Sequence, residues 1–119
     1  MTMRVIITGS RTWANRERIE TVLRSLPPGT VIVHGAHWAG ADAITDEIAQ
    51  KLGLPVERHP ADWQRYGRGA GPRRNEEMAA AGASRCIAFR APGRSPGTDD
   101  MMARAHAYGI PVEEVTIDE

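Results

Sequence analysis

Two adjacent arginines, Arg73 and Arg74, stand where the sequence predicts the start of a helix. The stretch GPRRNEEM places Pro72 at the first helical position, where its missing N–H costs nothing. A first turn carries partial positive charge, so arginines there are unfavourable unless an anion is present. In one interpretation both side chains are solvated, and Glu76 and Glu77 offset their charge by a few tenths of a kcal/mol. In the other, helix N–H groups and guanidinium groups together bind an oxyanion such as phosphate.

Loops rich in glycine or polar residues follow four of the predicted strands. Apart from the segment before Pro72, they contribute Gly9, Ser10 and Arg11; Gly35, Gly40 and Asp42; and Arg94, Gly97 and Thr98. A single loop glycine often serves only a turn. Four such loops at one edge of a sheet, with helix starts beside them, predict a shared anion site. We expect Arg11, Arg74 and the N–H groups at Gly40, Gly97 and Thr98 to hold a phosphate.

Three tryptophans, Trp13, Trp38 and Trp63, lie in or near these loops. Each ring could cover the core, stack on a nucleobase or contact a second copy of the chain. Trp63 belongs to the segment from residue 59 to residue 71, which is about as long as loops without secondary structure become in a compact domain. Its aromatic residues argue against disorder, so this segment is expected to have a function.

Composition and missing motifs exclude several classes of function. Fifteen basic and fifteen acidic side chains cancel, which removes any general attraction to nucleic acid or to an acidic membrane. The chain lacks both the Gly-x-Gly-x-x-Gly pattern and the P-loop pattern, and its four histidines lack ligand spacing, so we expect no cofactor and no metal. No run of about twenty apolar residues is present, which excludes a membrane span. A lone Cys86 in an apolar run indicates an inert buried thiol and fits the cytoplasm.

Short apolar runs alternate with helical periodicity along the whole chain, which predicts one α/β domain over residues 1–119. Strands are expected at residues 5–7, 31–33, 55–59, 86–89 and 112–117; helices are expected before Pro27, over residues 41–52, from Pro72 to near Gly82, and from near Thr98 to Gly109. The first, second and fourth strands are the most apolar and should be central. The prediction is a Rossmann-like three-layer sandwich with a five-stranded parallel sheet, strand order 3-2-1-4-5, and about four helices.

Taken together, the motifs resemble those of the SLOG superfamily over nearly the whole chain. The matching residues are Thr8-Gly9-Ser10-Arg11, Gly40-Ala41-Asp42, Ala61-Asp62-Trp63, Ala70-Gly71-Pro72 with Arg74-Asn75, and Gly97-Thr98. This Rossmann-like superfamily includes the DNA-processing Smf proteins and the LOG-type phosphoribohydrolases. The chain is most similar to the small bacterial and phage YspA-like, or YpsA-related, branch.

This resemblance implies a pocket for nucleotides or nucleotide-derived ligands at the strand-end loops. It matches Arg74 with the arginine of the LOG motif and Pro96-Gly97-Thr98 with a phosphate-binding turn. LOG enzymes carry a glutamate needed for cleavage three residues after that threonine, where this chain has Met101, with Asp100 one place earlier. In the loop after the second strand, residues 36–39 replace a position that is basic in the branch.

The leading hypothesis is therefore a domain that binds a nucleotide-derived small molecule. The expected binding residues are Gly9, Ser10, Arg11, Gly35, Gly40, Asp42, Asp62, Trp63, Arg73, Arg74, Asn75, Gly97 and Thr98. Asp42 or Asp62 would bind sugar hydroxyls, and Trp38 or Trp63 would cover the base. The enzymatic alternative is N-glycosidic cleavage of a nucleoside monophosphate with Asp100 and Arg74 as catalytic residues.

A third alternative is a nucleic-acid or protein-interaction module, which zero net charge and few aromatic residues weaken. Small size and three tryptophans are compatible with a symmetric homodimer. The start of the sequence has too short an apolar run for a signal peptide, so we expect a soluble cytoplasmic protein.

Overall fold

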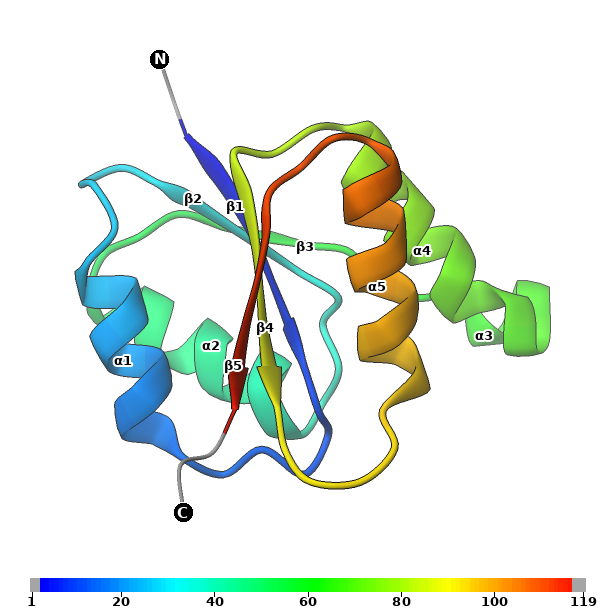
Figure 1. The fold of residues 1–119 in the computed structure, drawn as a ribbon, viewed down its shortest axis with the longest axis horizontal. Helices are drawn as coiled ribbons and strands as arrows, with labels where there is room; N and C mark the ends of the chain where they lie inside the picture. Colours follow the sequence, from blue (N-terminus) through cyan, green and yellow to red (C-terminus); the bar gives the residue numbers. More distant parts are fainter. Residues whose placement is uncertain (1–2, 117–119) are drawn as a thin grey trace.

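A five-stranded parallel sheet forms the centre of the computed structural model, which describes residues 3–116 (Figure 1). Its strands are β1 (Arg4–Gly9), β2 (Val31–His34), β3 (Val56–Arg58), β4 (Arg85–Arg90) and β5 (Val112–Thr116). They are ordered β3-β2-β1-β4-β5, which confirms the predicted order and the central place of the three most apolar strands. The predicted last residue of the fifth strand, Ile117, lies outside the described residues.

Helices cover both faces of this sheet and complete the predicted three layers. On one face α1 (Arg16–Arg24) and α2 (Gly40–Lys51) pack against Val5 and Ile7 of β1; on the other, α4 (Ala70–Ala80) and α5 (Pro96–Ala107) pack against Ile6. Successive strand residues point to opposite faces, and all three of these β1 side chains are fully buried, as expected for a strand covered on both sides. Within residues 3–116, no helix combines the length and apolar character that crossing a bilayer requires.

The segment between β3 and α4 differs from the loop that the sequence predicts. It contains a short helix, α3 (Trp63–Tyr66), and a 3-10 turn, η1 (Gly67–Gly69), which project beyond the sheet (Figure 1). The Asp62 side chain caps α3 by accepting the N–H of Arg65 at 3.1 Å. Because η1 runs directly into α4, that helix begins at Ala70, and the predicted start at Pro72 is wrong. Pro72 is tolerated as the third helical residue, since the first four N–H groups of a helix have no internal partner.

Trp13 belongs to the core rather than to a ligand site. Its side chain is 2% exposed and its ring meets that of Phe89 edge to face, with 5.3 Å between the ring centroids. The indole N–H donates to the carbonyl oxygen of Asn15 at 2.9 Å. Of the three uses weighed for the tryptophans, covering the core is therefore the one that applies to Trp13.

The single thiol is buried as the sequence predicts. Cys86 lies in β4 and packs with Ile6, Val33 and Met101 in the core beneath α4 and α5. Burial raises the pKa of the Cys86 thiol to about 12. The thiolate form that reacts with electrophiles is therefore scarce at neutral pH.

The end of β1 approaches α2 so closely that only glycine fits there. A Cβ atom on Gly9 would lie 2.6 Å from the Cβ of Ala41 and closer still to the carbonyl oxygen of Phe89. Both neighbours belong to packed elements, so neither can move without moving the layer to which it belongs. This contact brings the start of α2 to the carboxyl edge of the sheet.

We predict that Gly9→Ala lowers the free energy of unfolding by about 2 kcal/mol through overpacking. Gly69→Ala is the matched control, because a Cβ atom there meets nothing within 4 Å and φ is −77°. Its effect should stay within about 0.5 kcal/mol. Urea denaturation of both variants checks the prediction, and equal losses would contradict the contact at Gly9.

Candidate functional site

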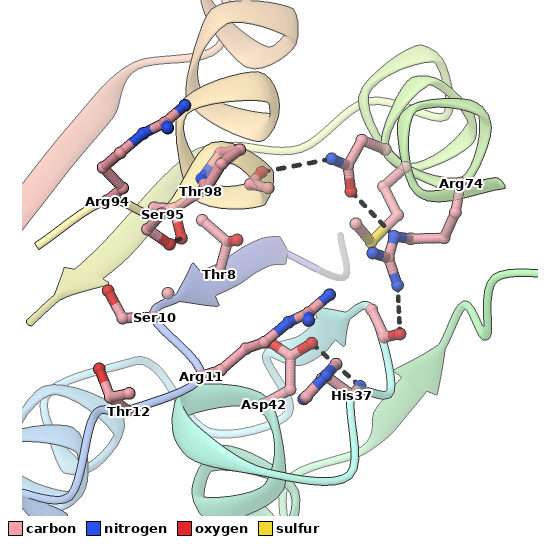
Figure 2. A pocket seen from close by; sticks show the side chains of 16 residues that line it. Thr8, Ser10, Arg11, Thr12, His37, Asp42, Arg74, Arg94, Ser95 and Thr98 are labelled. Atoms are coloured by element: carbon pink, nitrogen blue, oxygen red, sulfur yellow. Dashed lines mark hydrogen bonds between the residues drawn. The ribbon is translucent and has the colours of Figure 1, made fainter. Parts of the chain in front are cut away.

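A cavity of about 410 Å³ lies at the carboxyl edge of the sheet, among the loops that follow β1, β2 and β4 (Figure 2). Most of the predicted ligand-binding residues line it, namely Gly9, Ser10, Arg11, Gly35, Asp42, Arg74, Asn75, Gly97 and Thr98. The next strand after β1 in the chain, β2, lies on one side of β1 in the sheet, and β4 lies on its other side. Ligands of open α/β sheets bind at this kind of switch point.

Arg74 reaches the cavity from α4 and is half-buried there. Its Nε donates to Oδ1 of Asn75 at 2.9 Å, and its Nη1 donates to the carbonyl oxygens of Gly35 and, at 3.4 Å, His59. Burial lowers the pKa of Arg74 from its ordinary value, because desolvation disfavours the charged form. Gly35 makes this position accessible, since a Cβ atom there would lie 2.7 Å from Cζ of Arg74.

Arg73, the adjacent arginine, lies outside this cavity. Its side chain is exposed and its Cζ lies 4.1 Å from the centroid of the Tyr66 ring. Successive residues of a helix point about 100° apart, so two adjacent arginines cannot face the same cavity equally. The two arginines that were grouped in the sequence therefore have different surroundings, and only Arg74 lines the predicted anion site.

The positive charges of the cavity are not matched by ion pairs. Arg11 and Arg74 both line it, and within residues 3–116 neither has a carboxylate at ion-pair distance. The negative charge of Asp42 partly offsets the effect of desolvation on the pKa of Arg74. The charge of Arg11 lowers that pKa by a smaller amount, which indicates that the two guanidinium groups repel each other. Arg94, an exposed residue after β4, adds a third guanidinium group to the lining. This arrangement favours an anionic guest.

One helix start is open to the cavity. The N-cap of α5, Ser95, makes no side-chain cap; its hydroxyl oxygen lies 2.6 Å from that of Thr98. Among residues 3–116 the N–H groups of Gly97 and Thr98 have no acceptor, and both residues line the cavity. A Cβ atom on Gly97 would meet nothing within 4 Å, which shows that the space beside it is open. These two donors and the helix dipole can bind an anion.

The start of α2 packs against the loop after β1, so Gly40 does not have the place in the cavity that the sequence predicted for it. The N–H of Ala41 donates to the carbonyl oxygen of Ser10 at 3.1 Å, and Asp42 supplies a negative charge in the first turn. Gly40 does not line the cavity; a Cβ atom there would lie 2.5 Å from the carbonyl carbon of Arg11. Gly40 therefore allows two loops to pack together, with φ at +70°.

The loop after β2 is shaped by the buried His34. The N–H of Ala36 donates to Nδ1 of His34 at 2.9 Å, so the hydrogen of the neutral ring is on Nε2, which contacts Oδ2 of Asp46 at 2.7 Å. This bond holds Ala36 at φ +58°, a left-handed conformation that is uncommon outside glycine. A hydrogen bond from Arg58 lowers the pKa of Asp46 well below its ordinary value.

Asp42 brings a buried carboxyl group to the same cavity. Its side chain is 9% exposed, and its Oδ2 accepts the N–H of His37 at 3.1 Å. Burial raises the pKa of Asp42 above its ordinary value, although the N–H of His37 and the charge of Arg74 act in the opposite direction. The ionised form of Asp42 is thus destabilised in the unliganded protein.

Asp100, the expected catalytic residue, supports the cavity from behind. It does not line the cavity, and its Oδ2 accepts hydrogen bonds at 2.9 Å from Nδ2 of Asn75 and from Nε of Arg104. Asn75 in turn holds Arg74, so a chain of hydrogen bonds runs from α5 through Asn75 to the guanidinium group. Arg104 also contacts Glu76 at 3.0 Å, which ties α4 to α5.

Three other predicted binding residues are absent from the lining, namely Asp62, Trp63 and Arg73. Asp62 caps α3, and the half-exposed Trp63 lies over Gly71, where a Cβ atom would be 3.2 Å from its ring. Arg94 and Pro96, which the sequence placed in the anion-binding loop, also line the cavity. The lining residues that the sequence did not assign to the ligand are Thr8, Thr12, His37, Met78 and Ser95. Most of these residues are next to a glycine or an arginine of the same loop, and Met78 follows Arg74 by one helical turn. Their closeness in the sequence to predicted binding residues could therefore have identified them. No group of side chains among residues 3–116 is arranged to hold a metal ion.

Comparison with known proteins gives two matches. A family model described as YAcAr, the YspA, cpYpsA-related SLOG family, matches residues 3–66, which is more than half of the chain. The chain is also 43% identical over 118 residues to the Gene 61 protein of Mycobacterium phage D29, and the alignment covers 92% of this chain and 93% of that protein. The family match includes Arg11, Gly35 and Asp42, whereas Arg74 lies in the part that only the phage relative covers.

Asp42 and Asp46 lie one turn apart on α2 and should respond oppositely to neutralisation. The raised pKa of Asp42 means that the protein loses stability as pH rises from the ordinary carboxyl value through the folded-state value. Asp42→Asn removes that loss, and we predict a gain of about 1 kcal/mol at pH 7 that disappears near pH 3.

Asp46→Asn is the control, because the lowered pKa of Asp46 means that its charge stabilises the fold above the ordinary carboxyl value. This variant should lose about 2 kcal/mol at pH 7 and less as pH falls. Urea denaturation between pH 3 and pH 7 measures both effects. Comparable losses at pH 7 in the two variants would show that Asp42 is an ordinary stabilising carboxylate.

Proposed function

Because the chain belongs to the YspA, cpYpsA-related SLOG family, we propose that its cavity binds a nucleotide or a nucleotide-derived phosphate ligand. The observation that carries this proposal is the pair Arg11 and Arg74, which line one cavity and have no carboxylate at ion-pair distance among residues 3–116, with Asp42 as a single, more distant counter-charge. A partly buried charge is costly unless it is paired, and the two guanidinium groups also repel each other. A bound phosphate would offset both costs.

The phosphate group is proposed to lie at the start of α5. The N–H groups of Gly97 and Thr98 supply two backbone donors, and the hydroxyl groups of Thr8 and Ser95 lie on the same side of the cavity (Figure 2). Arg94 extends from the same loop and can approach from the solvent side. Oxygen atoms of a phosphate monoester accept from several such donors at once.

A ligand larger than inorganic phosphate is favoured by the dimensions of the cavity. Its volume of about 410 Å³ falls within the range of roughly 300–1,000 Å³ that is typical of small-molecule sites. Among the described residues that line the cavity, His37 has the only aromatic ring, so the base would lie toward the rim. Trp38 is 86% exposed and stacks on His37, with 5.5 Å between centroids, and we propose that its ring covers the base.

Binding is preferred to N-glycosidic cleavage because the expected catalytic carboxylate is outside the cavity. Asp100 is engaged by Asn75 and Arg104, and the next residue, Met101, is fully buried. A nucleic-acid module is not preferred, because opposite charges balance over the chain.

Arg74→Ala tests the proposal, with Arg73→Ala as a control that removes the same charge one residue away. A hydrogen bond to a charged group contributes about 1.5–3 kcal/mol, so we predict that Arg74→Ala weakens the best nucleoside 5′-monophosphate about 10- to 100-fold. Arg73→Ala should change the affinity less than about twofold. Isothermal titration calorimetry with AMP, GMP, CMP and UMP measures both effects, after thermal unfolding has shown that the variants fold.

Equal losses in the two variants would mean that only general positive charge attracts the ligand. Absence of heat with every monophosphate and with the corresponding diphosphates would refute nucleotide binding by the unmodified protein.

A further inference from the structure

Asp42 is the one acidic residue in the lining of the cavity that the described chain forms. Its side chain is more than nine-tenths buried and reaches the cavity from the first turn of α2 (Figure 2). One carboxylate oxygen, Oδ2, accepts the N–H of His37 at 3.1 Å. The other, Oδ1, has no hydrogen-bond partner among residues 3–116. Oδ1 is open to the cavity and not sealed in the core, since Oγ1 of Thr45 is the one fully buried side-chain polar atom without a partner in the described chain. It can therefore accept a hydrogen bond from a donor group of a ligand in the cavity.

The charge of Asp42 determines which part of a ligand can meet it. A phosphate group placed against Oδ1 would bring two negative charges into contact in a partly desolvated site. Phosphate is better accommodated at the start of α5, where Gly97 and Thr98 offer donors. The cavity thus has a donor end at α5 and an acceptor at Asp42. A matching ligand carries phosphate at one end and hydrogen-bond donors at another.

Sugar hydroxyls and base amino groups are the two kinds of donor that a nucleotide can offer. Trp38, the ring proposed to stack on the base, is exposed and does not line the cavity, whereas Asp42 is buried within it. In a nucleotide the sugar lies between the phosphate and the base. The buried acceptor is therefore matched with the sugar, and the exposed ring with the base.

We propose, on the basis of the function proposed above, that Asp42 accepts hydrogen bonds from the vicinal hydroxyl groups of a ribose. The site then selects ribonucleotides over 2′-deoxyribonucleotides. A carboxylate can accept from two adjacent hydroxyl groups, and the free Oδ1 together with the second lone pair of Oδ2 provides the acceptors. A bound sugar would exclude water from these acceptor atoms, so loss of the 2′-hydroxyl would leave one acceptor incompletely satisfied, which lowers affinity.

Calorimetry with matched pairs tests this inference. The probes are ribose 5-phosphate against 2-deoxyribose 5-phosphate, and AMP, GMP, CMP and UMP against their 2′-deoxy counterparts. We expect each ribose compound to bind about tenfold or more tightly than its deoxy partner, by a similar ratio for all four bases. Asp42→Asn should bring each ratio to within about twofold while phosphate-dependent binding persists.

Asp62→Asn is the control, because Asp62 lies outside the cavity and Asn also caps helices well. It should leave every ratio unchanged. Equal affinity for ribose and deoxyribose compounds would overturn the inference and leave nucleotide binding intact. Selectivity for a single base that Asp42→Asn abolishes would overturn it too, by assigning the carboxylate to base recognition. If no nucleoside phosphate binds, both this inference and the proposed function are refuted.

Discussion

The site depends on three positions where backbone segments, or a backbone and a guanidinium group, pack so closely that only glycine fits. Gly9 allows α2 to pack on the end of β1, Gly40 allows the loop after β1 to approach α2, and Gly35 allows Arg74 to lie against bare backbone. Parallel strands bring these segments to the same edge of the sheet. The three glycines then let the segments close around a cavity, and they permit the carbonyl oxygen of Gly35 to orient Arg74.

Electrostatics distinguish this cavity from the ion-paired surface beside β4 and α5. On the outer surface Arg90 contacts Asp99 and Glu114, and Arg104 contacts Asp100 and Glu76. In the cavity, by contrast, Arg11, Arg74 and Asp42 approach one another without forming an ion pair among the described residues. The pKa of Asp42 is raised and that of Arg74 is lowered, both chiefly by burial. Charged groups that lie in a cleft, and whose charged forms are destabilised by burial, are typical of binding and catalytic sites.

The sequence was sufficient for the fold and for most of the cavity, because apolar runs, helical periodicity and strand-end loops follow from local patterns. It failed where side-chain direction depends on the exact start of a helix. The sequence grouped Arg73 with Arg74, yet the helix begins at Ala70, and only Arg74 faces the cavity. Trp13 was similarly ambiguous, because its contact with Phe89 joins residues far apart in the chain. Whether the ligand is a nucleotide stays a prediction, since neither the fold nor the family match identifies it.

The structure also explains why the LOG-like arrangement of catalytic residues does not carry over to this chain. Thr98 faces the cavity, but Met101, one turn later, is fully buried against Ile6 and Val33, where a carboxylate would be desolvated without a partner. Asp100 points instead toward α4, because adjacent helical residues differ by about 100° in direction. Neither position lines the cavity. The acidic group that lines the cavity comes from α2, on the opposite side of β1, which places it away from the phosphate site proposed at the start of α5.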